Sequence, residues 1–130
     1  MTLNDATEKV REFHDAFGIK NAEAPTAQLS ESNIVLRYKL MREENEEYLE
    51  AAKQGDLVEI ADALGDMLYI LCGTILSHGL EGKMTEVFEE IQRSNMSKLD
   101  KNGNAIYRED GKVLKSDLYS KPDLASILKN

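Results

Sequence analysis

Residues 57–77 read LVEIADALGDMLYILCGTILS, a stretch in which nearly every side chain is apolar or small. Its charged members are Glu59, Asp62 and Asp66, which are spaced three and four residues apart. This spacing places the three carboxylates along one edge of a helix. A bilayer-spanning helix would rarely tolerate acids in successive turns, so the stretch predicts a buried helix of a soluble protein. Cys72, the one cysteine of the chain, is expected to fill apolar space there.

The sequence around this stretch predicts a helical hairpin. Asp56 is a suitable N-cap, with Glu59 placed to complete a capping box, and the helix can run to about Ser77. The preceding segment predicts another long helix at residues 31–54, which Gly55 stops. Two long helices joined by so short a connection must fold back on each other.

Apolar side chains at helical spacing predict two further helices, at residues 4–17 and 84–98. The simplest packing of these helices with the hairpin is a four-helix bundle-like fold of the all-α class. A chain of 130 residues fits one domain. We therefore expect a single domain over residues 1–130, with a helical core at about 4–99.

The last part of the chain, about residues 100–130, has a different sequence pattern from the helical core. Strand-like runs at 105–107 and 113–114 flank the turn dipeptide Asp110-Gly111, which predicts a small hairpin. A tail follows, and it is expected to end in a short helical turn at residues 124–128.

The formal net charge of −8 argues against binding to nucleic acid, which needs clustered Lys and Arg. Any phosphate handled by this chain is therefore expected to arrive with a cation. The chain opens without a basic segment followed by an apolar run, so we expect a cytoplasmic protein with no membrane association. A domain this short is also expected to oligomerise in order to complete an active cleft.

Acids in the helix at 31–54 face those of the next helix. Leu40, Glu44 and Glu47 follow one stripe, with Glu43 beside it, so the carboxylates point toward the same partner as the apolar residues. A buried carboxylate needs a proton or a partner, which here predicts a cation between the two helices. Ligands that are all oxygen atoms suit a hard ion, with Mg²⁺ the common choice beside phosphate. A run of glutamates seen alone is more often a solvated helix face.

The helix at 84–98 offers a phosphate-binding arm. Its apolar stripe ends in Asn95 and Lys98, an amide donor and an ammonium that could meet a phosphate. The alternative is a lysine that complements the negative end of the helix dipole.

At this point the sequence resembles a known family. Glu43-Glu44-x-x-Glu47 followed by Glu59-x-x-Asp62 is similar to the signature of the all-α NTP pyrophosphatase superfamily, which includes MazG-like proteins, dimeric dUTPases and phosphoribosyl-ATP pyrophosphohydrolases. Further segments similar to MazG-like and phosphoribosyl-ATP-pyrophosphohydrolase-like proteins are Phe13-His14-x-Ala16-Phe17-Gly18, Ala61-Asp62-Ala63-Leu64-Gly65-Asp66, Ser94-Asn95-Met96-Ser97-Lys98 and residues 106–115.

The resemblance implies an Mg²⁺-dependent enzyme, with Mn²⁺ as a possible substitute, that cleaves a nucleoside triphosphate between its α and β phosphates. It also implies a homodimer or a dimer of dimers. The implied metal ligands are Glu44, Glu47, Glu59 and Asp62. Glu43 would be a further ligand or the base that activates water, and Glu47 would share in catalysis. The residues implied to bind the substrate are Asp66, Asn95, Lys98, Lys112 and Lys115.

Two alternatives stay open. Phosphoribosyl-ATP pyrophosphohydrolases normally carry a histidine soon after the Glu-x-x-Asp acids, where this chain has Asp66-Met67. That departure favours nucleotide-pool house-cleaning over histidine biosynthesis. The residues do not exclude a different class of protein, a non-catalytic helical module whose acids bind a cation for structure or pair with a basic partner.

Overall fold

The computed structural model describes residues 1–129, and the chain is mostly helical, as the all-α prediction requires. It divides into two compact units, Met1–Gly82 and Lys83–Asn130, which are described separately below. The elements in chain order are α1 (Leu3–Ala16), α2 (Glu31–Gln54), α3 (Leu57–Ser77), α4 (Met84–Met96), β1 (Ile106–Tyr107), β2 (Val113–Leu114) and α5 (Leu124–Leu128).

The ends of the first three helices follow local capping chemistry. α2 begins after Ser30, whose hydroxyl accepts the Asn33 N–H at 3.2 Å, and it ends at Gly55 in the left-handed region (φ 67°). α3 begins after Asp56, whose carboxylate accepts the Glu59 N–H at 3.2 Å. The predicted boundaries of both helices are confirmed. The returning half of the α3 capping box, from the Glu59 side chain, is not seen within residues 1–129.

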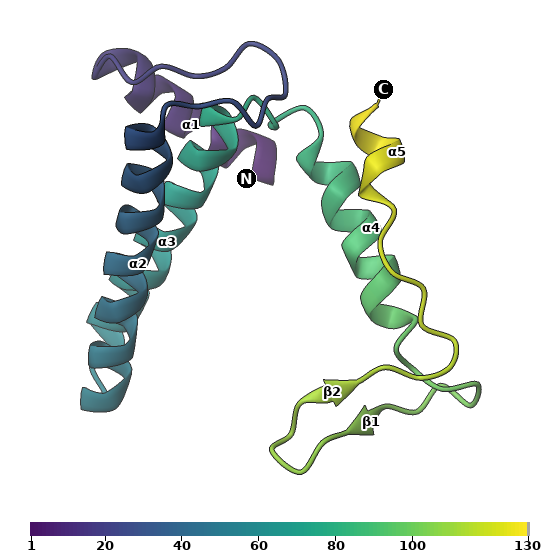
Figure 1. Cartoon of the computed structure of the whole chain (residues 1–130). Helices are drawn as coiled ribbons and strands as arrows, with labels where there is room; N and C mark the ends of the chain where they lie inside the picture. Colours follow the sequence, from purple (N-terminus) through teal and green to yellow (C-terminus); the bar gives the residue numbers. More distant parts are fainter. Residues whose placement is uncertain (130) are drawn as a thin grey trace. The chain divides into compact units, whose positions relative to one another are not determined.

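The first unit is built on the α2–α3 hairpin, whose two helices lie side by side along most of their length (Figure 1). α1 packs against α3 as well. Its Val10 meets Cys72 and Leu76 in a core cluster, where Cys72 is 1% exposed. Cys72 therefore fills apolar space, as predicted.

α3 is far less buried in its own chain than the sequence suggests. Leu57 and Val58, in its first turn, are 76% and 75% exposed, and its buried residues concentrate after Cys72. The contacts of α1 with α3 that involve Tyr69, Cys72, Gly73 and Leu76 all lie in the second half of α3. By length and composition alone α3 could cross a membrane, with one third of its apolar window buried. The prediction of a helix buried throughout is therefore wrong for a single chain.

The loop between α1 and α2 is fastened to the end of α3. The Ala22 N–H donates to the Leu76 carbonyl at 3.2 Å, and the Thr26 N–H donates to the His78 carbonyl at 2.9 Å. Nδ1 of His78 lies 2.8 Å from the Thr26 carbonyl. In α1, Nδ1 of the buried His14 lies 2.6 Å from the Asn21 side-chain oxygen. Both histidines thus lie near helix ends, and their contacts hold the loop in place.

The second unit contains α4, α5 and the β-hairpin. α4 ends at Met96, two residues before the predicted end at Lys98. β1 and β2 pair antiparallel, with Ile106 opposite Leu114, and the turn between them contains Gly111. The predicted hairpin and the final helical turn are therefore confirmed. Three of the four predicted bundle helices pack in the first unit, and α4 belongs to the second. The prediction of a single domain stays a prediction.

Candidate functional site

The predicted acids converge around Glu44, on the face of α2 that meets α3. Its Oε2 atom is shielded from solvent and has no hydrogen-bond partner within residues 1–129. The carboxylates that act on it electrostatically are Glu47, Asp66 and Asp62. Glu47 lies one turn further along α2, and the two aspartates come from α3. The hairpin therefore places three acidic side chains around a poorly hydrated oxygen of a fourth, Glu44.

The surroundings of Glu44 raise the pKa of its carboxyl from 4.5 to about 7. Loss of hydration is the largest cause, followed by the adjacent Glu47 side chain and then by the charges of Asp66 and Asp62. Each of these disfavours the ionised form, and no cation of the described chain offsets them. Because ionisation of the Glu44 carboxyl is unfavourable here, the group is stabilised either by a proton or by a bound cation.

Not every predicted site residue joins this group. Glu43 and Glu59 are exposed and have no hydrogen bond or ion pair that links them to Glu44 in the described part of the chain. No three Asp, Glu, His or Cys side chains among residues 1–129 converge closely enough to enclose a metal ion. Glu46 and Glu50 lie off the stripe that carries Glu44 and Glu47, and their side chains accept hydrogen bonds from Arg42 and Gln54.

A pH-dependent stability is expected from Glu44. Between about pH 4.5 and 7 the folded chain holds a proton on this carboxyl that the unfolded chain has lost. Stability should therefore fall as pH rises through this window. Urea unfolding of the metal-free protein at pH 5 to 8 should show this fall for wild type relative to Glu44→Gln. Parallel curves for the two proteins would contradict the assignment.

Arg37 was missed by sequence reasoning. It lies two turns before Glu44 on the same face of α2, and no acid stands three or four residues from it. Its Nε donates to Thr74 Oγ1 at 3.0 Å and its Nη2 to the Ile70 carbonyl at 2.9 Å. Burial lowers the pKa of this guanidinium. In the sequence, the lack of an acid three or four residues from Arg37 was the signal that this side chain points inward.

The second unit carries the predicted phosphate arm. Asn95 is exposed near the end of α4, and Lys98 lies half-buried in the turn that follows. The Lys98 carbonyl accepts the Ser116 N–H at 3.2 Å, and the Leu99 carbonyl accepts the Ser116 hydroxyl at 2.7 Å. The Ser120 N–H donates to the Ser97 hydroxyl at 2.9 Å. These hydrogen bonds from the C-terminal segment hold the backbone around Lys98 in place.

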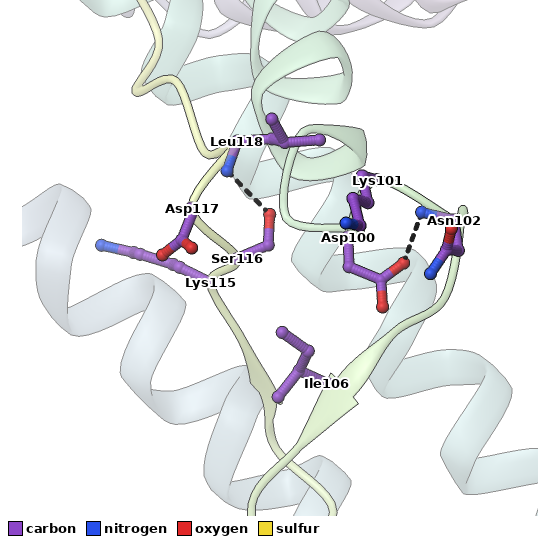
Figure 2. A pocket seen from close by; sticks show the side chains of 8 residues that line it. All are labelled: Asp100, Lys101, Asn102, Ile106, Lys115, Ser116, Asp117 and Leu118. Carbon is purple, nitrogen blue, oxygen red and sulfur yellow. Dashed lines mark hydrogen bonds between the residues drawn. The ribbon is translucent and has the colours of Figure 1, made fainter.

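The hairpin lysines lie in the same unit. Lys112 is exposed beside the turn, and Nζ of Lys115 lies 4.5 Å from the centre of the Tyr119 ring. Figure 2 shows Lys115 at the edge of a cavity of about 500 Å³, with its side chain extending away from Asp100 and Ile106, which also line the cavity. The cavity mixes acids and lysines, and Asp100 is engaged by backbone N–H groups of Asn102 and Asn104. Its balanced charge does not make a phosphate cradle by itself.

Comparison with known proteins identifies the family. Residues 10–95 match the model of the phosphoribosyl-ATP pyrophosphohydrolase family, and this chain belongs to that family, within the MazG-like all-α NTP pyrophosphatase superfamily. The match covers α2 and α3 with all their acids and ends at Asn95, before Lys98, Lys112 and Lys115. No curated protein matches the chain significantly.

Family membership supports a pyrophosphohydrolase, and pyrophosphohydrolases of this group generally use divalent metal ions. The roles of individual residues stay predictions.

Proposed function

We propose that this chain is a nucleoside triphosphate pyrophosphohydrolase, which cleaves a ribo- or deoxynucleoside triphosphate to the monophosphate and pyrophosphate. The observation that carries the proposal is the shielded, unpartnered Oε2 of Glu44 beside three further carboxylates. We place the enzyme in the cytoplasm, in nucleotide-pool house-cleaning.

The donor set fits a divalent cation. Oxygen atoms of Glu44, Glu47, Glu59 and Asp62 would hold it, and oxygen-only donors suit Mg²⁺ or, as a substitute, Mn²⁺. When bound, the ion neutralises phosphate charge and makes a bound water more acidic. Glu47, Glu59 and Asp62 are exposed, and in the described chain they do not enclose an ion together with Glu44, so binding would require these side chains to move toward it.

The remaining residues are assigned to proton transfer and substrate positioning. Glu43, exposed next to Glu44, takes the proton of the attacking water, a role that Glu47 could share. Asp66 orients a ligand or bonds the sugar. The groups that bind the phosphates are Asn95, Lys98, Lys112 and Lys115, from the same or another subunit. Cleavage breaks the bond between the α and β phosphates, and pyrophosphate leaves.

The active form is proposed to be a homodimer or a dimer of dimers. Apolar side chains remain exposed along both helices of the hairpin, among them Leu36, Leu49, Leu57, Val58 and Leu68. Exposed apolar side chains in this number along one hairpin favour a protein contact. A second copy of the chain would cover them and would exclude water from the neighbouring acids.

Two other functions remain as alternatives. The family's name favours phosphoribosyl-ATP as substrate, whereas Asp66-Met67 departs from the histidine expected there. A non-catalytic cation-binding module is supported by no observation beyond the acids themselves.

The test of the proposed function is pyrophosphate release from a panel of ribo- and deoxynucleoside triphosphates and phosphoribosyl-ATP, with Mg²⁺, with Mn²⁺ and with EDTA. We expect release from members of the triphosphate panel with either metal and none with EDTA. Release from phosphoribosyl-ATP alone would replace the substrate assignment. No release from any compound would favour the non-catalytic module.

A further inference from the structure

Two adjoining cavities lie where the α1–α2 loop meets the start of α2. Their volumes are about 330 and 340 Å³, and they share Lys20, Leu29, Asn33 and Ser77 in their walls. Neither wall contains an Asp or a Glu. The two cavities together therefore carry an excess of positive charge, although the chain as a whole has a net charge of −8.

Two cations of different kinds supply that charge. Lys20 stands exposed in the wall of both cavities, and Arg37 lines one of them. Arg37 donates to the neutral oxygens of Thr74 and Ile70, and no carboxylate among residues 1–129 forms an ion pair with it. A half-buried guanidinium without a counter-charge is a ready partner for an anion.

The cavity is aligned with the acidic group. Arg37 and Glu44 are seven residues apart on α2, which is nearly two full turns, so they share a face about 10 Å apart. On α3, Ile70 contacts Arg37, and Asp66, one turn earlier, acts on Glu44. Arg37 and the acidic group therefore lie along the same face of the hairpin, about two helical turns apart.

We propose that this cavity binds a phosphate monoester through Lys20, Arg37 and the Asn33 amide. One source of that group is a substrate that carries phosphates at both ends, with its triphosphate at the acids. The other is a free sugar phosphate bound independently of turnover. The first assignment rests on the proposed pyrophosphohydrolase activity, with phosphoribosyl-ATP, the alternative substrate named above, among its substrates, whereas the second does not depend on turnover.

The binding test uses ribose 5-phosphate and inorganic phosphate as probes, titrated calorimetrically into the full chain with EDTA and no nucleotide. We expect both to bind wild type, and Lys20→Glu to weaken binding at least about tenfold. Lys20→Met should fall between the two. Lys53→Glu, which makes the same change of charge at an exposed lysine in the last turn of α2, is the matched control and should bind like wild type.

Three outcomes would overturn the site. These are no binding to wild type up to about 10 mM, unchanged binding by Lys20→Glu, or equal weakening by Lys20→Glu and Lys53→Glu. Because binding is measured without turnover, these outcomes are separate from a failure of the enzyme assay.

Turnover then distinguishes the two sources. If the phosphate belongs to the substrate, Lys20→Glu should lower kcat/KM for phosphoribosyl-ATP at least about tenfold more than kcat/KM for ATP. If it belongs to a free sugar phosphate, wild type should not turn over phosphoribosyl-ATP, or the two values should change equally, while ribose 5-phosphate binding is lost in Lys20→Glu. Either result is consistent with the phosphate site and identifies the source of the phosphate that it binds.

Discussion

Replacing Glu47 with glutamine should lower metal-dependent pyrophosphate release by at least about 100-fold, since a ligand worth several kcal/mol of charge stabilisation is lost. The fold should survive, because Glu47 is exposed and its amide replacement has the same shape. Stability should stay level or rise slightly, since one of the charges acting on Glu44 is removed. Pyrophosphate release and urea unfolding, measured on the same preparation, test both expectations.

The matched control is Glu46→Gln, one residue away on α2. Glu46 is exposed and pairs with Arg42 at 3.1 Å, away from the acidic group. The control should therefore keep wild-type turnover. Unchanged turnover in Glu47→Gln, or an equal loss in both variants, would sink the assignment of Glu47 to the site.

Gly79→Ala should destabilise the chain by about 2–4 kcal/mol. Gly79 lies in the left-handed region (φ 67°), and a Cβ there would come within 2.4 Å of the Ala24 carbonyl oxygen. Backbone of the fastened loop would have to move, which would disturb the Thr26 contacts with His78. The free energy of unfolding in urea measures the effect.

Gly18→Ala separates the two causes. Gly18 has almost the same φ, 69°, but a Cβ there would meet nothing within 4 Å. It should lose only the conformational part, about 1–2 kcal/mol. If the two variants lose the same stability, the close approach of Ala24 to Gly79 does not constrain the fold.

The helices could be predicted well because their ends are encoded locally. Ser30, Gly55 and Asp56 act on groups within four residues of themselves, and the structure places the α2 and α3 boundaries where those residues indicate. The predicted end of α4 at Lys98 was two residues too late, and the cause lies in the turn that follows Met96. After Met96 the chain turns through the Lys98 N–H bond to the Asn95 carbonyl, and the C-terminal segment holds it there.

What could not be predicted depends on contacts between distant segments. Helical spacing put Glu44, Asp62 and Asp66 on facing edges, but it could not show that Glu44 alone would be shielded. Nor could composition show that the start of α3 lacks cover within its own chain, since an apolar sequence looks the same whether its partner is the same chain or another. Arg37 was overlooked because its partners, Ile70 and Thr74, are more than thirty residues away.

The C-terminal segment also determines where the chain can be truncated without disrupting α4. A boundary drawn at Asn95, where the family match ends, would separate α4 from the residues bonded to it. Arg93 donates to the Ser120 and Lys121 carbonyls, and Glu90 accepts the Asp123 N–H at 2.6 Å. A helix of 13 residues has little stability alone in water. Helix and tail therefore form one cooperative folding unit, and the smallest intact fragment that contains α4 extends past residue 123.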